Sequence, residues 1–208
     1  MAISFVSAET AIQNSGTTIT INKPSGVVAG DLMVAAFIVS ASGVPAITPP
    51  AGWDSRGNAQ ATNTKMATFT KIAGPSEPSS YAFTTDLTIT EGSGAIAAYR
   101  AGGAIIIGNN AFTSGATSNP TVAPSVVTEQ PNAKLLCAFM AISLGSGVTG
   151  MTQRVVVDNT SRDVGIFDQD IPSPGATGSR TYTGSGNGHG FSLSIEEESG
   201  GSRIRMMI

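Results

Sequence analysis

The chain has 208 residues, with 14 acidic and 11 basic side chains and a formal net charge of −3. Charged residues make up 12% of the sequence, about half of the ~25% found in ordinary soluble domains, so a basic nucleic-acid-binding surface is not indicated. Apolar residues account for 40%, which excludes a wholly disordered chain and is enough for the core of one large or two small domains.

The first hundred residues predict five β-strands and no helix. Apolar residues seldom recur at helical spacing, and 25 Gly and 11 Pro interrupt nearly every window of the length that a helix needs. Alternation around β-branched residues predicts a strand at 17–22, and the nearly continuous apolar run at 32–39 fits a strand covered on both faces. Further strands, each bounded by residues with turn chemistry, are predicted at 66–72, 81–85 and 95–101.

The second half repeats the pattern of the first after a loop-rich connection at 108–120. Five more strands are predicted at 135–143, 153–157, 163–169, 180–183 and 191–197. LMVAAFIVS matches LLCAFMAIS, and SGAIAAYR matches HGFSLSIE, at an offset of about 100 residues, which indicates a duplication.

These patterns predict an all-β fold in which a single jelly-roll-like β-sandwich is built from two pseudo-repeated strand quartets. The sandwich spans residues 1–200, with pseudo-repeats at about 17–102 and 120–198. Two small sandwiches are the alternative. A C-terminal arm, 201–208, follows.

The arm is apolar where chain ends are usually polar. Gly-Gly-Ser is followed by two arginines interleaved with apolar residues. It is either a last edge strand on its own sheet or a docking arm that adds to a neighbouring subunit by strand augmentation. The candidate partner-docking residues are Arg203, Ile204, Arg205, Met206, Met207 and Ile208.

No residue pattern in the chain predicts catalysis. His189, the only histidine, lies in GSGNGHGF, where a solvated turn is expected, and no G-x-S-x-G elbow occurs. The acidic stretch at 158–163 and the pair Asp168 and Asp170 do not match a calcium loop, and one Cys with one His cannot make a zinc site. The charge run at 196–198 is interpreted as a solvated strand end. We predict no catalytic, cofactor-binding or metal-ligating residue, no cofactor, and a protein that is not an enzyme.

Cys137 and the N-terminal segment bear on where the protein is made. Cys137 sits in the apolar run LLCAFMAI as a small hydrophobe, with no second cysteine in the chain to pair with. The start MAISFVSAETA lacks the basic and apolar regions of a secretion signal, and no apolar run approaches the ~18 residues of a membrane span. Neither a secretion signal nor a membrane association is expected.

Residues 23–102 contain two turn motifs and one characteristic strand end. The turn KPSGVVAGD contains Pro24, Gly26, Gly30 and Asp31, which set a tight reversal into the strand LMVAAFIVS. In ITPPAGWDSRG, Gly52 lets the backbone bend so that Trp53 can plug one end of the core. The third piece, GAIAAYRA, ends a strand.

Together with ATFTKIAGPSEPSSYAFT, these motifs resemble a β-rich family of tailed-bacteriophage virion proteins over residues 23–102. The resemblance implies a non-enzymatic building block of the particle, either a head decoration protein or a tail-fibre or receptor-binding module.

A chain of 208 residues fits a compact capsid decoration (cement) protein better than a complete fibre. We therefore expect a homotrimer made in the host cytoplasm and exposed on the outside of the virion, where it contacts the major capsid protein. A receptor-binding module for host glycans and an accessory domain of a carbohydrate-active enzyme are the alternatives.

Overall fold

The structure is a computed structural model that describes residues 3–113, 120–144, 147–182 and 188–198. Within these ranges every regular element is a β-strand, and all strand pairs are antiparallel. The predicted all-β fold with layered sheets is therefore confirmed.

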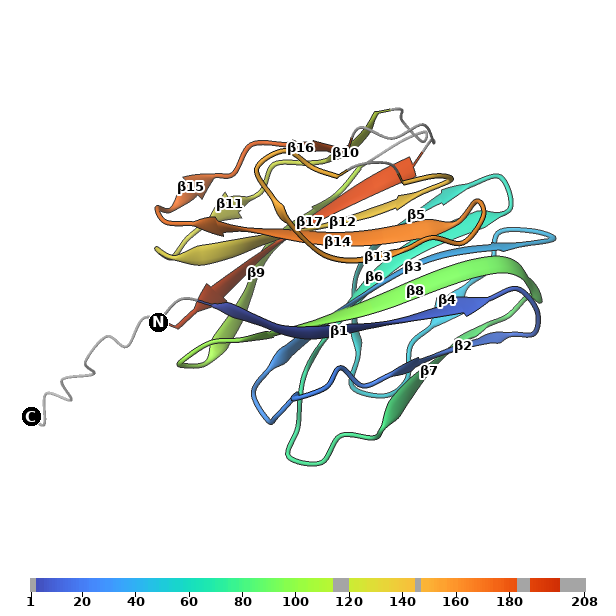
Figure 1. The fold of residues 1–208 in the computed structure, drawn as a ribbon, viewed down its shortest axis with the longest axis horizontal. Helices are drawn as coiled ribbons and strands as arrows, with labels where there is room; N and C mark the ends of the chain where they lie inside the picture. The colour runs from blue at the N-terminus through green and yellow to red at the C-terminus, as the bar shows by residue number, and fades with distance from the viewer. Residues whose placement is uncertain (1–2, 114–119, 145–146, 183–187, 199–208) are drawn as a thin grey trace, which may run out of the picture.

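Two five-stranded sheets form the centre of the molecule (Figure 1). The first large sheet contains, in spatial order, β1 (Ser4–Gln13), β8 (Ile89–Arg100), β3 (Leu32–Ala41), β6 (Thr64–Ile72) and β5 (Asp54–Ala61). The second large sheet contains β13 (Thr152–Val157), β14 (Asp163–Ile171), β12 (Ala133–Ala141), β17 (Gly188–Glu197) and β9 (Ile105–Phe112). All strands of the first sheet belong to the N-terminal half, residues 3–103, and all strands of the second to the C-terminal half, described between 104 and 198.

The two large sheets are equivalent and pack face to face. The strands of the second sheet, taken in the spatial order β9, β17, β12, β14 and β13, correspond one by one to β1, β8, β3, β6 and β5 of the first. Strand β1 contacts β13, and β5 contacts β9, so the halves are related by an approximate twofold axis along the strands. Two identical subunits pack in this isologous way in a symmetric dimer.

Smaller sheets cover the outer faces, which gives four layers. Below the first large sheet in Figure 1 lies a three-stranded sheet of β2 (Thr18–Asn22), β7 (Ser80–Thr85) and β4 (Ile47–Thr48). Above the second lie two pairs, β10 (Thr121–Ala123) with β16 (Arg180–Tyr182) and β11 (Val127–Thr128) with β15 (Gly175–Ala176).

Three apolar clusters separate these layers, and the central strands contribute to two clusters each. Leu32, Val34 and Ile38 of β3 face the core between the large sheets, whereas Met33 and Phe37 face the core under the three-stranded sheet. Likewise Leu136 of β12 faces the central core and Phe139 the outer one. A strand covered on both faces needs apolar residues at every position, which explains the continuous runs in the sequence.

The repeat units differ from the strand quartets expected from the sequence. Each half supplies five strands to its own large sheet, and neither large sheet mixes strands from the two halves. The sheet orders thus do not show a single jelly roll across both repeats. Strands β1, β5 and β9 were missed because they are sheet edges with mixed polarity, and β9 runs through the first part of the segment assigned to a loop, 108–120.

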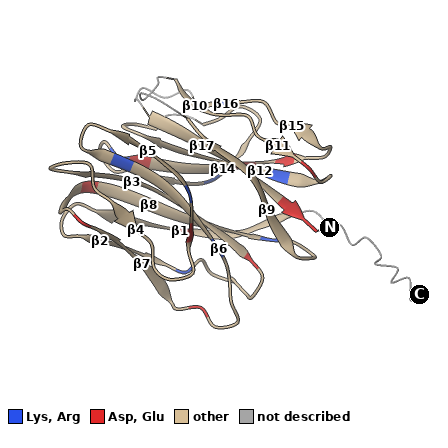
Figure 2. Cartoon of the chain, turned by 180° about the vertical axis from the view of Figure 1, so that it is seen from behind, with Lys and Arg blue, Asp and Glu red and all other residues tan. Residues whose placement is uncertain are grey.

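In the part of the chain that Figure 2 colours, basic and acidic residues are interspersed over both strands and loops. None of the described segments forms a helix that could cross a membrane.

Candidate functional site

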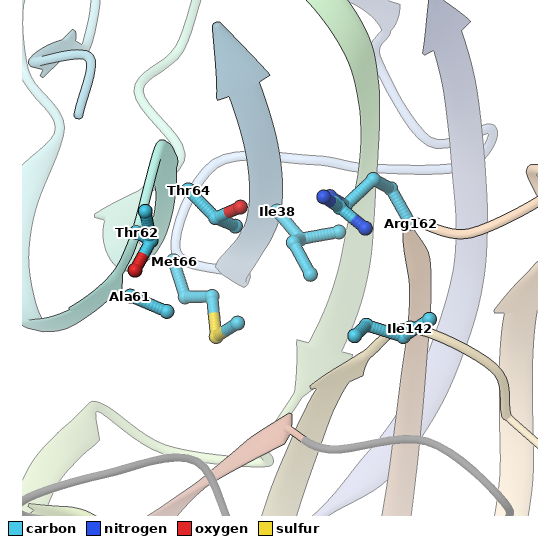
Figure 3. Close-up of a pocket in the computed structure, with 7 residues that line it drawn as sticks. All are labelled: Ile38, Ala61, Thr62, Thr64, Met66, Ile142 and Arg162. Atoms are coloured by element: carbon cyan, nitrogen blue, oxygen red, sulfur yellow. The ribbon is translucent and has the colours of Figure 1, made fainter. Parts of the chain in front are cut away.

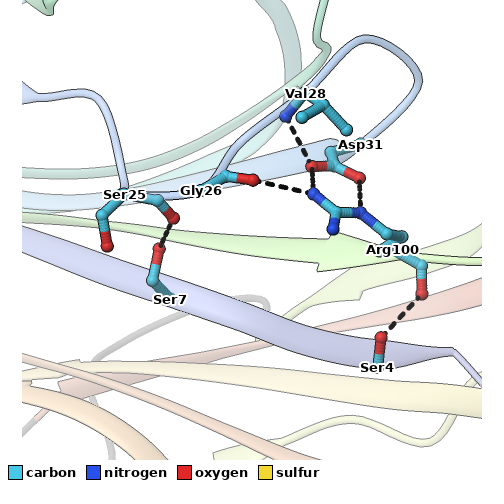
Figure 4. A network of polar contacts seen from close by, with 7 residues as sticks. All are labelled: Ser4, Ser7, Ser25, Gly26, Val28, Asp31 and Arg100. Atoms are coloured by element: carbon cyan, nitrogen blue, oxygen red, sulfur yellow. Dashed lines mark hydrogen bonds and ion pairs between the residues drawn. The ribbon is translucent and has the colours of Figure 1, made fainter.

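The turn at 23–31 is clipped to the end of β8 by an ion pair between the buried Asp31 and the partly exposed Arg100 (Figure 4). Asp31 is buried, and Arg100 donates to it twice, from Nε to Oδ1 at 2.8 Å and from Nη2 to Oδ2 at 2.7 Å. Bidentate pairing of this kind fixes orientation as well as charge. The hydrogen bonds from Arg100 to Asp31 raise the pKa of the guanidinium.

The rest of the turn joins the same network. Gly26 O accepts from Arg100 Nη2 at 2.8 Å, and Val28 N donates to Asp31 Oδ2 at 2.9 Å. On the neighbouring strand, Ser7 Oγ donates to Ser25 O at 2.6 Å (Figure 4). Both oxygens of Asp31 are thus engaged within the fold, and the arrangement holds a turn in place.

The other motif residues also lie where a structural role requires them. Gly26, Gly30 and Gly52 have positive φ values of 73°, 92° and 84°, the left-handed region that favours glycine. Trp53 is buried, with its ring edge-on to Tyr81 at a centroid distance of 5.1 Å. It packs in the outer core of the N-terminal half, under the three-stranded sheet.

A second ionic cluster lies in the C-terminal half, beside the central core. Arg154 donates to Asp168 from Nε at 2.7 Å and from Nη2 at 2.9 Å. Lys134 Nζ lies 2.5 Å from Asp170 Oδ1 and 3.8 Å from Asp168 Oδ1. The Asp168 side chain is 1% exposed and that of Asp170 75% exposed, so the cluster runs from the core to the surface.

This cluster reaches the N-terminal half across the seam, by which we mean the interface between the two large sheets and the loops at its ends. The Arg154 guanidinium lies 4.8 Å from the ring centroid of Phe5 in β1, at cation–π distance. Burial, followed by the nearby Asp168 carboxylate, raises the pKa of Tyr99 in β8 well above its ordinary value. The two aspartates considered for metal binding in the sequence are thus counterions of the buried Lys134 and the partly buried Arg154. Asp168, through Arg154 and Tyr99, also links the two halves.

The acidic stretch at 158–163 forms a loop that docks on the N-terminal half. Asp163 accepts from Asn159 N at 2.9 Å and from Leu144 N at 2.7 Å. Asn159 Nδ2 donates to Gly92 O at 3.1 Å, and Ser161 donates from N and Oγ to Glu91 at 2.8 and 2.6 Å. The carboxylate oxygens of Asp163 therefore fix the loop, and the side chains of the loop in turn hydrogen-bond to the N-terminal half. Among the described residues, no group of three or more His, Cys, Asp or Glu could hold a metal ion.

The prediction that His189 is a solvated turn residue is wrong. His189 lies within β17 and is fully buried, with Nδ1 3.3 Å from Thr113 O, and burial lowers its pKa. The flanking glycine Gly190 belongs to the same strand, and a Cβ there would come within 2.4 Å of the backbone of Val122 and Ala123. The glycine-rich spacing reflects this close backbone approach, a signal that a turn-based interpretation overlooks.

Glu196 also differs from its predicted place. Instead of lying on a solvated strand end, its side chain is buried and accepts from Glu129 N and Gln130 N, both at 3.0 Å. Cys137 is buried 3.5 Å from Ser192 Oγ, and burial raises its pKa to about 12, so the thiol stays protonated at neutral pH.

We compare two of the hollows in the described surface. The larger, about 370 Å³, is lined by Thr149, Gln169, Ser179, Arg180 and Thr181. Its arginine is already engaged, because Nη2 donates to Gln169 Oε1 at 2.7 Å and Nη1 to Thr177 O at 2.8 Å. The smaller hollow, about 170 Å³, lies at the seam. The larger falls just inside the range of small-molecule sites, about 300–1,000 Å³, and the smaller falls below it.

The candidate partner-docking residues 203–208 lie outside the described residues, so the arm stays a prediction. Comparisons with protein-family models, curated proteins and solved structures found no match to this chain. The virion-protein resemblance consequently rests on the motifs alone. The motif residues fix turns within the N-terminal half. The contacts that join the two halves come from other residues, chiefly Arg154 and the 158–163 loop.

Proposed function

We propose that this chain is a structural protein of a tailed-bacteriophage virion, most specifically a capsid decoration (cement) protein that contacts the major capsid protein. The observation that carries the proposal is the role of two residues of the resemblance, Asp31 and Arg100: they form an ion pair that fixes a turn, with both oxygens of Asp31 engaged inside the fold. A motif whose residues fix a turn fits a building block better than a catalyst.

The double sandwich supports the same role. The two face-to-face sheets share one core, and polar contacts join the halves at both ends of the strands: Arg154 over the Phe5 ring at one end, and the 158–163 loop on Gly92 and Glu91 at the other. Such a body is suited to bearing load on a pressurised shell. Low charge density also suits dense packing of like subunits, because a strongly single-signed surface would oppose it.

Reconstitution on capsids tests the proposal. Purified protein is added to capsids assembled without it, and occupancy is measured by electron cryo-microscopy together with the capsid melting temperature. We expect saturable density on the outer surface and a higher melting temperature. Absence of bound density at saturating protein would overturn the decoration role.

Matched measurements separate the neighbouring hypotheses. A variant lacking 202–208 tests the arm, since unchanged occupancy would exclude a docking role for it. Sedimentation of the isolated protein tests the trimer. Adsorption of the protein to host cells would instead favour a receptor-binding module, and release of reducing sugar from host polysaccharide would favour a carbohydrate-active protein.

A further inference from the structure

We propose that the seam notch, the smaller hollow lined by Ile38, Ala61, Thr62, Thr64, Met66, Ile142 and Arg162, binds one aliphatic side chain of a partner protein together with an adjacent carboxylate. The partner segment therefore carries Leu, Ile or Met beside Asp or Glu. If the partner is the major capsid protein, that step rests on the proposed function; the notch itself does not.

The notch has an apolar interior of the right size for one side chain. Ile38 and Met66 are almost completely buried, and Ile142 is 44% exposed. Figure 3 shows these three side chains around the hollow, with the Arg162 guanidinium directed toward Ile38. A volume of about 170 Å³ is too small for a typical small-molecule ligand but is on the scale of a single aliphatic side chain. Exposed apolar surface in a small pocket is typical of an interaction hot spot.

Arg162 gives the notch its charge preference. Its Nε donates to Ser40 Oγ at 2.5 Å and its Nη1 to Ser161 O at 2.5 Å, and neither acceptor carries a charge. Within the described ranges no carboxylate lies within 4.0 Å of Arg162, whereas Arg100, Arg154 and Lys134 each have one. Glu91, in the same loop contact, accepts from Ser161 instead.

These contacts leave Nη2 of Arg162 for a ligand. A carboxylate placed there would complete the ion pair, and a cationic segment would be repelled.

The notch exists only when the two halves are docked. Ile38 and the β5–β6 hairpin come from the N-terminal half, and Ile142 and Arg162 from the C-terminal half. The loop that carries Arg162 is held to the N-terminal half through Asn159 and Gly92. Because the cation is oriented before binding, less conformational entropy is lost on association.

A small probe with the same two features tests the notch directly. Methyl-labelled protein is titrated with N-acetyl-L-leucine and followed by NMR at the methyl groups of Met66 and Ile142. We expect saturable shifts, with binding about two- to fivefold weaker for N-acetyl-L-leucinamide, which lacks the carboxylate. Arg162→Gln should make the two probes bind equally. As a control, Lys65→Gln removes a different cation, one that lies on the β5–β6 hairpin, and should leave the preference for the carboxylate probe unchanged.

The proposal is overturned if these methyl groups do not respond to either probe, or if the wild-type protein binds the two probes equally. Ala61→Phe provides a second variant that fills the notch without touching the hydrogen bonds of Arg162. It should abolish the shifts while the protein keeps its melting temperature. If Arg162→Gln fails to fold, this variant carries the test.

Capsid binding then separates this inference from the proposed function. If the wild-type protein decorates capsids and Ala61→Phe decorates them at least tenfold more weakly, the notch contacts the capsid protein. Equal decoration by both would overturn that contact but leave the decoration role standing. If the wild-type protein does not decorate capsids, the proposed function fails, and the probe titration alone decides whether the notch binds its ligand.

Discussion

The N- and C-terminal halves share one sheet order but anchor their central strands with opposite charges. Asp31 precedes the run LMVAAFIVS and pairs with Arg100, whereas Lys134 precedes the matching run LLCAFMAIS and pairs with Asp170 and Asp168. Each half thus pairs the charged residue that precedes the apolar run of its central strand, with opposite sign. The partner comes from non-equivalent strands, β8 in the N-terminal half and β14 in the C-terminal half.

The segments before these two strands also differ in which residue accepts hydrogen bonds from their backbone amides. In P-S-G-V-V and P-S-V-V, the second valines, Val28 and Val127, are similarly exposed, at 53% and 51%, although Val28 lies in a turn and Val127 begins β11. The turn amide of Val28 is bonded by Asp31, a local residue, but those of Glu129 and Gln130 are bonded by Glu196 from β17. One half closes its turn locally and the other through the last strand.

Asp168→Ala should have the largest effect, because it leaves Arg154 and Lys134 in the seam without their buried counterion. We expect the free energy of unfolding to fall by about 3–5 kcal/mol, measured by urea denaturation. Asp170→Ala removes a mostly exposed partner of the same lysine and should cost no more than about 1 kcal/mol. Equal losses would show that burial does not govern this cluster.

Glu196→Ala should have the next largest effect, since two turn amides lose a charged acceptor at once. A loss of about 1.5–3 kcal/mol is expected in the same assay. Glu198→Ala, two residues further along and exposed, is the matched control and should stay within about 0.5 kcal/mol of wild type. Protection of the Glu129 and Gln130 amides from hydrogen exchange should fall only in Glu196→Ala.

Asn159→Ala should loosen the far end of the seam at a cost of about 1 kcal/mol, because the side-chain bond to Gly92 O is lost. Hydrogen exchange at β8 and at the 158–162 loop should rise, while the β2–β7 pair keeps its protection. Asp158→Ala, an exposed neighbour, serves as control. Uniform loss of protection across both halves would mean that they unfold as one unit.

The smallest expected effect is a pH dependence carried by the C-terminal half. Burial lowers the pKa of His189 below its ordinary value of 6.5, so the unfolded chain binds the proton first as the pH falls. Stability is then fully present above the unfolded pKa and declines as the pH drops through it. Urea midpoints at pH 7.5 and 5.5 should differ less in His189→Gln than in wild type; an unchanged difference would assign it to other groups.

Local pattern alone determined much of this protein: the strands with continuous apolar runs, the duplication and the turn glycines. These features depend on neighbouring residues and on burial of one stretch of chain, which periodicity reports. Edge strands such as β5 and β9 escaped because half of their environment is solvent or another sheet, so their polarity is mixed.

Only the tertiary structure decided where the single polar residues lie. His189 and Glu196 sit in segments that look solvated in the sequence, yet β17 is covered on both faces once the halves dock. The seam notch is likewise invisible in the chain order, because Ile38, Met66, Ile142 and Arg162 come from opposite halves. Contacts between distant segments depend on how two sheets pack, and the sequence carries no local periodicity for that packing.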